Sequence, residues 1–182
     1  MLPCGWATWS HKFLKYYDGN LDSLNDAEKI KQFKASYLSN ALYKQQFYSI
    51  NQTKYFLDTI PQKSSWDYQM LFSLRANNLY GISPCSNQIK NVGVDTFSEH
   101  GGTSMNFEMT RRLCGMESYE FDFPLVHPES VKIDRRYEML ISDILLMPKW
   151  GRVKRYFAKI VKHLLGLPPY CSMQDKLKRI RL

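Results

Sequence analysis

Long apolar runs are missing from this sequence of 182 residues. No uncharged stretch approaches the roughly 20 apolar residues that a membrane-spanning helix needs. The first residues also lack the basic and apolar regions of a signal peptide. We therefore expect a cytoplasmic protein that is either soluble or peripheral at the inner face of the cell membrane.

Cysteine patterns that bind zinc are missing as well. The four cysteines lie far apart, and neither a CxxC pair nor a Cys/His spacing suited to a metal occurs. Such spacing indicates free thiols in a reducing compartment. Motifs of serine hydrolases, phosphate-binding loops and cysteine nucleophiles are absent too, so those classes of enzyme have no support.

Acidic residues are scarce at the C-terminal end. From Lys149 onward there are ten Lys or Arg against the single Asp175, a net charge of +9 in a chain whose total is +8. Beyond Pro148, apolar residues recur at helical spacing and basic residues fill the rest of the wheel, which predicts a basic amphipathic helix closed by Gly166. We therefore divide the chain into residues 1–147 and a basic helix and tail, 148–182.

Two interpretations of this basic helix stay open. Residues 149–165 would bind an anionic membrane surface, where each Lys or Arg gains about 1 kcal/mol, or the helix would pack on the preceding domain. No recognisable nucleic-acid-binding motif accompanies the charge, so we expect no nucleic-acid partner.

Helical spacing of apolar residues dominates residues 1–147. A helix over about residues 6–17 would place Trp6 and Trp9 on one apolar stripe, and Asn25 with Glu28 predicts the start of the next helix. That helical region would end at Pro61. Further helices are predicted from just after Ser64-Ser65 to about residue 78, and over about residues 108–116 and 134–146.

Non-helical patterns are few. Leu79–Pro84 is short, apolar and stopped by proline, so we predict a buried strand there. Residues 87–104 are rich in Asn, Gly, Ser and Thr and predict a long loop. With 44% hydrophobic and 14% aromatic residues, the chain should form a folded domain of the α/β class that is mostly helical in this portion.

Asp67 is the main candidate for a catalytic residue. It follows Ser64-Ser65-Trp66 at a predicted helix start, where a carboxylate can act as a general base at the mouth of a cleft. The same pattern fits a capping box, in which Asp67 would accept a hydrogen bond from the Ser64 amide. From periodicity alone, both roles stay open.

Two other groups could bind ligands. His100 precedes Gly101 and Gly102, so it could ligate a divalent ion while the glycine amides approach phosphate, or it could be an ordinary histidine of a surface loop. Gly5, Trp6 and Trp9 could form a platform for an acceptor, or this aromatic stripe could belong to the core. Trp66 is predicted on the buried side of its helix, although a tryptophan face also stacks well on sugar rings.

Several motifs resemble a family of bacterial family-2-like glycosyltransferases, also described as nucleotide-diphospho-sugar transferases or hemolytic-protein-like. The resemblance covers roughly residues 2–140, with the motifs in the family's order. They are Gly5-Trp6-Ala7-Thr8-Trp9 with Lys15-Tyr16-Tyr17-Asp18, Trp66-Asp67-Tyr68-Gln69, Ile82-Ser83-Pro84, Asn87-Gln88-Ile89-Lys90-Asn91-Val92-Gly93 and Phe123-Pro124-Leu125-Val126-His127-Pro128.

A more distant likeness implies a mechanism. Inverting N-acetylglucosaminyltransferases of the GT-A class carry Gly-Trp, Trp-Asp and Ser-x-His-Gly segments, which correspond here to Gly5-Trp6, Trp66-Asp67 and Ser98–Gly101. The likeness implies that Asp67 is the catalytic base, that the tryptophans bind the acceptor and that His100 lies near a Mn or Mg ion and the diphosphate. The donor would be a nucleotide sugar and the acceptor a glycan or a lipid-linked glycan.

One departure from the family concerns the donor side. The family's nucleotide-binding strands and its Asp-x-Asp metal motif precede the Gly-Trp segment, and His100 is followed by Gly101 where many members have Thr. We therefore expect an incomplete GT-A-like fold, the C-terminal acceptor-side part, inactive without a nucleotide-binding half. The alternative is a non-catalytic remnant or interaction module of the same fold.

Overall fold

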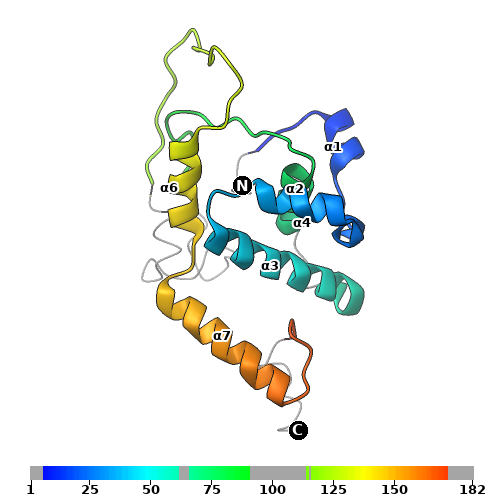
Figure 1. Ribbon diagram of the computed structural model, residues 1–182. Coiled ribbons are helices and arrows are strands. Elements are labelled where there is room, and N and C mark those ends of the chain that lie inside the picture. Colours follow the sequence, from blue (N-terminus) through cyan, green and yellow to red (C-terminus); the bar gives the residue numbers. More distant parts are fainter. Residues whose placement is uncertain (1–5, 62–65, 91–113, 115, 172–182) are drawn as a thin grey trace. The chain divides into compact units, whose positions relative to one another are not determined.

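A computed structural model describes residues 6–61, 66–90, 114 and 116–171, and these residues are mostly helical with no strand (Figure 1). The chain divides into two compact units. The first contains Thr8–Tyr80 and Asp134–Leu182, and the second contains Leu2–Ala7 and Gly81–Ile133. All the named helices belong to the first unit: α1 (Ser10–Tyr16), the 3-10 turn η1 (Asp22–Asn25), α2 (Ala27–Ala35), α3 (Asn40–Thr59), α4 (Trp66–Ala76), α6 (Arg135–Leu145) and α7 (Lys149–Leu164).

The core of the first unit forms where α4 packs on α2 and α3. Phe33 of α2, Ile50 of α3 and Phe72 of α4 are fully buried, and the rings of Phe33 and Phe72 are 5.2 Å apart. Each such side chain contributes about 1.5–3 kcal/mol through burial, and tilted aromatic pairs add to this. The core cluster is completed by Leu21, Leu71 and Ala76.

The turn between α1 and η1 is fixed by Asp18 and Leu21. The Asp18 carboxylate accepts hydrogen bonds from the amides of Asp22 (3.1 Å) and Ser23 (2.8 Å). Leu21 has a left-handed backbone with φ of 55°, yet its side chain is completely buried in the core. A left-handed backbone costs a residue with a Cβ about 1–2 kcal/mol, so core packing and the Asp18 hydrogen bonds must offset this strain.

Aspartate side chains cap the N-termini of two helices. Asp26 accepts hydrogen bonds from the amides of Glu28 and Lys29 at the start of α2, so the prediction that Asn25 caps this helix is wrong by one residue. Asn25 is instead the last residue of η1. Asp134 accepts from the amides of the second and third residues of α6, which confirms the helix predicted to begin there.

Two sequence predictions near the ends of α1 and α4 are wrong. α1 begins at Ser10, because Trp9 has an extended backbone, so Trp6 and Trp9 do not share a helical stripe. Leu79–Pro84 forms no strand, and Ile82 is 87% exposed. Asn78 has a φ of 52°, and the Leu79 amide donates back to the Leu74 carbonyl. This Schellman closure ends α4.

The second unit contains irregular backbone in its described part. The Tyr119 amide donates to the Asn87 carbonyl at 2.8 Å, and Asn87 Nδ2 donates to the Glu117 carbonyl at 2.7 Å. Lys90 and Glu117 form an exposed ion pair of 2.8 Å. Most of the helix predicted at 108–116 and most of the loop predicted at 87–104 lie outside the described residues.

Membrane-spanning helices are absent from the described part of the chain, where no helix combines the length and the apolar character needed to cross a bilayer.

Candidate functional site

Asp67 lies in the first turn of α4, next to Trp66, which is 42% exposed. The Asp67 side chain is half-buried. Because the peptide dipoles of a helix leave partial positive charge at its N-terminus, this position favours a carboxylate. Ser64 lies outside the described residues, so the capping-box hypothesis for Asp67 stays a prediction. The sequence prediction that Trp66 lies on the buried side of its helix is wrong.

Hydrogen bonds hold the start of α4 against the turn that follows α1. Gln69 Nε2 donates to the Gly19 carbonyl at 2.9 Å, and the Asp18 amide donates to Ser73 Oγ at 2.8 Å. Ser73 Oγ in turn donates to the Gln69 carbonyl at 2.7 Å. Gln69 and Ser73 are both buried, so these bonds fix the turn next to Asp67.

Tyr17 provides a protonated hydroxyl within electrostatic reach of Asp67. Its pKa is raised above the ordinary value, first by burial and then by the negative charges of Asp18 and Asp67. The Tyr17 ring stacks on Phe13 with centroids 4.6 Å apart. A Cβ at residue 19 would meet the Tyr17 ring at 3.1 Å, so Gly19 permits this close approach.

Gln69 leaves a polar atom unsatisfied beside the same turn. Its Oε1 is buried and has no hydrogen-bond partner among the described residues, although its Nε2 is bonded to Gly19. A buried acceptor without a donor costs about 1–3 kcal/mol. A buried water that donated a hydrogen bond to this atom would remove that cost. No role for Gln69 follows from the sequence, although Gln69 belongs to the Trp66–Gln69 motif.

The tryptophans predicted to bind an acceptor are all exposed. Trp9 immediately precedes α1 and lies in the same compact unit as Trp66 and Asp67. Trp6 belongs to the second unit. Because large exposed aromatics are available for binding, the hypothesis that Trp6 and Trp9 belong to the core is wrong.

Groups suited to a divalent metal are absent from the described residues. No cluster of three or more His, Cys, Asp or Glu side chains occurs in that part of the chain. His100, Gly101 and Gly102 lie outside it. The described residues therefore do not by themselves fit the Mn or Mg ion that the resemblance implies, and the metal stays an expectation for a complete enzyme.

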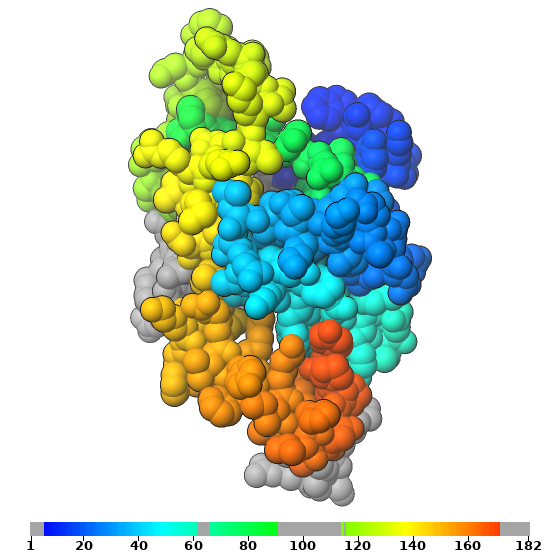
Figure 2. Space-filling model, viewed as in Figure 1, coloured from blue at the N-terminus to red at the C-terminus, as the bar shows by residue number. Residues whose placement is uncertain are grey.

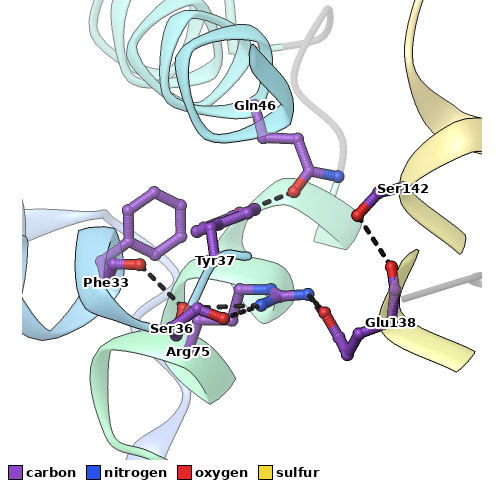
Figure 3. Close-up of polar contacts among 7 residues, drawn as sticks. All are labelled: Phe33, Ser36, Tyr37, Gln46, Arg75, Glu138 and Ser142. Atoms are coloured by element: carbon purple, nitrogen blue, oxygen red, sulfur yellow. Dashed lines mark hydrogen bonds and ion pairs between the residues drawn. The ribbon is translucent and has the colours of Figure 1, made fainter. Parts of the chain in front are cut away.

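A second polar cluster joins α2, α3, α4 and α6 (Figure 3). Arg75 donates to the Ser36 carbonyl at 2.8 Å and forms an ion pair of 3.1 Å with Glu138. Tyr37 Oη donates to Gln46 Oε1 at 2.6 Å, and burial raises the pKa of Tyr37 well above its ordinary value. Because these groups are bonded to one another, we assign the cluster a structural role.

Comparisons of the chain with protein-family models, with curated proteins and with solved structures find no match. The resemblance described from the sequence therefore depends on its motifs alone. Within the described residues, the structure brings Trp66 and Asp67 together with the turn formed by Tyr17, Asp18 and Gly19. This group is the candidate functional site.

Proposed function

We propose that this chain is the acceptor-binding part of a GT-A-class glycosyltransferase. One observation carries the proposal: Asp67 lies at the start of α4 beside the exposed Trp66, and the neighbouring Tyr17–Gly19 turn is fixed to the same helix. A rigidly supported carboxylate next to an aromatic face suits the binding and activation of a sugar hydroxyl. The complete enzyme would act in the synthesis of a surface glycan.

The proposed reaction inverts the configuration of the transferred sugar. The acceptor hydroxyl attacks the anomeric carbon of a nucleotide sugar, and the bond to the nucleoside diphosphate breaks as the new glycosidic bond forms. Asp67 accepts the proton of the hydroxyl during this attack. The faces of Trp66 and Trp9, which lie in the same compact unit as Asp67, would stack on the acceptor sugars.

A nucleotide-binding half would supply the donor. A Mn or Mg ion bound there would neutralise charge on the departing diphosphate. His100 of this chain is the proposed contact to that region. The proposal for Asp67 does not depend on the metal, because proton acceptance needs only the carboxylate and a positioned hydroxyl.

The test compares transfer by the longest product of the reading frame that contains this chain with transfer by its variants. Asp67→Asn should lower transfer from nucleotide sugars by about 100-fold or more while the unfolding midpoint changes little. Asp58→Asn is the matched control, because Asp58 is an exposed carboxylate on α3 that pairs with Lys54. It should retain full activity.

Two results would contradict the proposal. Full transfer by Asp67→Asn, with stability lowered by about 1 kcal/mol, would make Asp67 a helix cap. Binding of glycans without transfer from any nucleotide sugar would make the chain a non-catalytic interaction module. Glycan binding is measured by calorimetry, with Trp66→Ala expected to weaken it and Trp150→Ala, on α7, expected to leave it unchanged.

A further inference from the structure

α7 turns its basic side toward the protein. The Arg155 guanidinium lies 5.1 Å and the Lys159 Nζ 5.0 Å from the centroid of the Tyr48 ring on α3. Lys162 is buried, and its Nζ donates to the Pro169 carbonyl at 3.1 Å. Cations over an aromatic face and along apolar surface are stabilised in this arrangement. The predicted amphipathic helix is confirmed, and its basic side contacts the domain.

The apolar stripe of α7 consequently faces away from α3. Trp150 is 68% exposed and Leu164 78% exposed, and α7 forms part of the molecular surface in Figure 2, where it is orange. A helix of a globular protein ordinarily turns its apolar side to the core, so this orientation is reversed. An exposed apolar patch of this kind marks an interaction surface. The stripe is made of Trp150, Val153, Phe157, Ile160, Val161 and Leu164, all of them exposed.

Contacts with α3 fix this orientation at both ends of the helix. Before α7, the Gln45 side chain donates to the Leu145 carbonyl at 2.9 Å and accepts from the Met147 amide at 2.8 Å. After α7, Tyr48 Oη donates to the Pro169 carbonyl and Gln52 Nε2 to the Tyr170 carbonyl, both at 3.1 Å. The outward direction of the stripe is therefore set by the folded unit.

Cations border the stripe, and the segment of sequence that carries it has no acidic residue. Lys149 and Lys154 are exposed, and Lys154 Nζ lies 5.8 Å from the Trp150 ring. No Asp or Glu occurs between Asp143 and Asp175. An apolar surface with aromatic residues and with lysines at its border is complementary to an anionic lipid surface, where acyl chains meet negative headgroups.

We propose that α7 docks on an anionic membrane surface with this apolar stripe inserted at the boundary between headgroups and acyl chains. Lys149 and Lys154 then lie at the level of the headgroups, and the contacts of Arg155 and Lys159 with Tyr48 keep the domain on the aqueous side. The proposal is independent of the proposed glycosyl transfer, because it rests on the exposed stripe, its cationic border and the contacts with α3.

The test measures sedimentation of the full chain with vesicles of phosphatidylcholine alone and of phosphatidylcholine with 30% phosphatidylserine. Binding should occur on the phosphatidylserine vesicles and should weaken at high salt. The double variant Trp150→Ser/Phe157→Ser should bind at least 10-fold more weakly, and it should fold because both side chains are exposed. Lys149→Gln/Lys154→Gln should weaken binding by roughly fivefold for each charge.

Leu14→Ser is the matched control, because Leu14 is 81% exposed on a different helix, α1. It should bind like the unchanged chain. All of these variants keep the basic tail beyond residue 171, so a loss in Trp150→Ser/Phe157→Ser assigns insertion to the stripe.

Three results would overturn the proposal: equal binding to both kinds of vesicle, unchanged binding by Trp150→Ser/Phe157→Ser, or no vesicle binding at all. If the last result came with dimers that Trp150→Ser/Phe157→Ser abolishes in sedimentation equilibrium, the stripe would instead bind a second copy of the chain.

Discussion

Arg75 on α4 and Glu138 on α6 form an ion pair across a separation of 63 residues, with Nη2 and Oε2 3.1 Å apart. The same guanidinium lies over the Tyr37 ring, 4.2 Å from its centroid. The two charged side chains are 15% and 28% exposed. This pair therefore attaches α6 to the helices that carry the core.

Glu138→Gln should lower the free energy of unfolding by about 1–3 kcal/mol, because it leaves a mostly buried guanidinium without its counter-charge. Urea unfolding followed by circular dichroism measures this. Lys31→Gln is the control, since Lys31 and Glu28 form an exposed pair 3.5 Å apart and such pairs contribute about 0–1 kcal/mol. Equal effects of the two variants would contradict a special role for the Arg75 pair.

Tyr37 should make the fold sensitive to alkali. Its folded-state pKa is raised, mainly by burial, whereas an unfolded tyrosine ionises near pH 10. The unfolded chain therefore loses a proton above about pH 10 that the folded chain keeps. The stability linked to this group is fully present below pH 10 and falls above it, with a slope of up to about 1.4 kcal/mol per pH unit.

Urea unfolding from pH 8 to pH 11.5 measures this slope. Tyr37→Phe should reduce it while lowering stability at neutral pH, because Gln46 loses its donor. An unchanged slope in Tyr37→Phe would show that other tyrosines account for the alkaline sensitivity.

The start of α2 offers a comparison between adjacent residues. Asp26→Ala should cost about 1 kcal/mol of stability, because two helix amides lose their acceptor. Asn25→Ala should cost less than about 0.5 kcal/mol, since Asn25 is not the capping residue. The measurement is thermal unfolding with hydrogen exchange at the amides of Glu28 and Lys29. The reverse order of effects would support the cap predicted from the sequence.

Periodicity and capping residues predicted most of the helices, because both signals are local. α3 ends at Thr59, before Pro61, and α6 and α7 follow the predicted ranges. The strand predicted over Leu79–Pro84 is wrong, because a short apolar segment does not reveal whether a partner strand exists. The orientation of α7 could not be predicted from the sequence either, because a helical wheel identifies the apolar side of a helix but not the side that faces the protein. Tyr48 and Gln45 of α3 decide that orientation.

Part of the candidate site could be predicted from the sequence. Trp66 and Asp67 are adjacent, so a motif could identify them, and the exposure of Trp66 became known only from packing. Gly19 contacts Gln69 across 50 residues and Asp18 contacts Ser73 across 55 residues. Such long-range hydrogen bonds have no periodic signature. The motif containing Tyr17 and Asp18 was the one available signal.

At Leu21 the left-handed backbone favours glycine, whereas the core packing favours a leucine side chain. Glycine would relieve the backbone strain at this position, but it would empty the space that the leucine side chain fills at the centre of the core. The segment around Leu21 is thus locally frustrated, and its native shape depends on the packing of α2, α3 and α4 around it as well as on the local Asp18 hydrogen bonds. Formation of this turn should therefore be coupled to assembly of the core. A peptide of residues 15–26 alone should not adopt it.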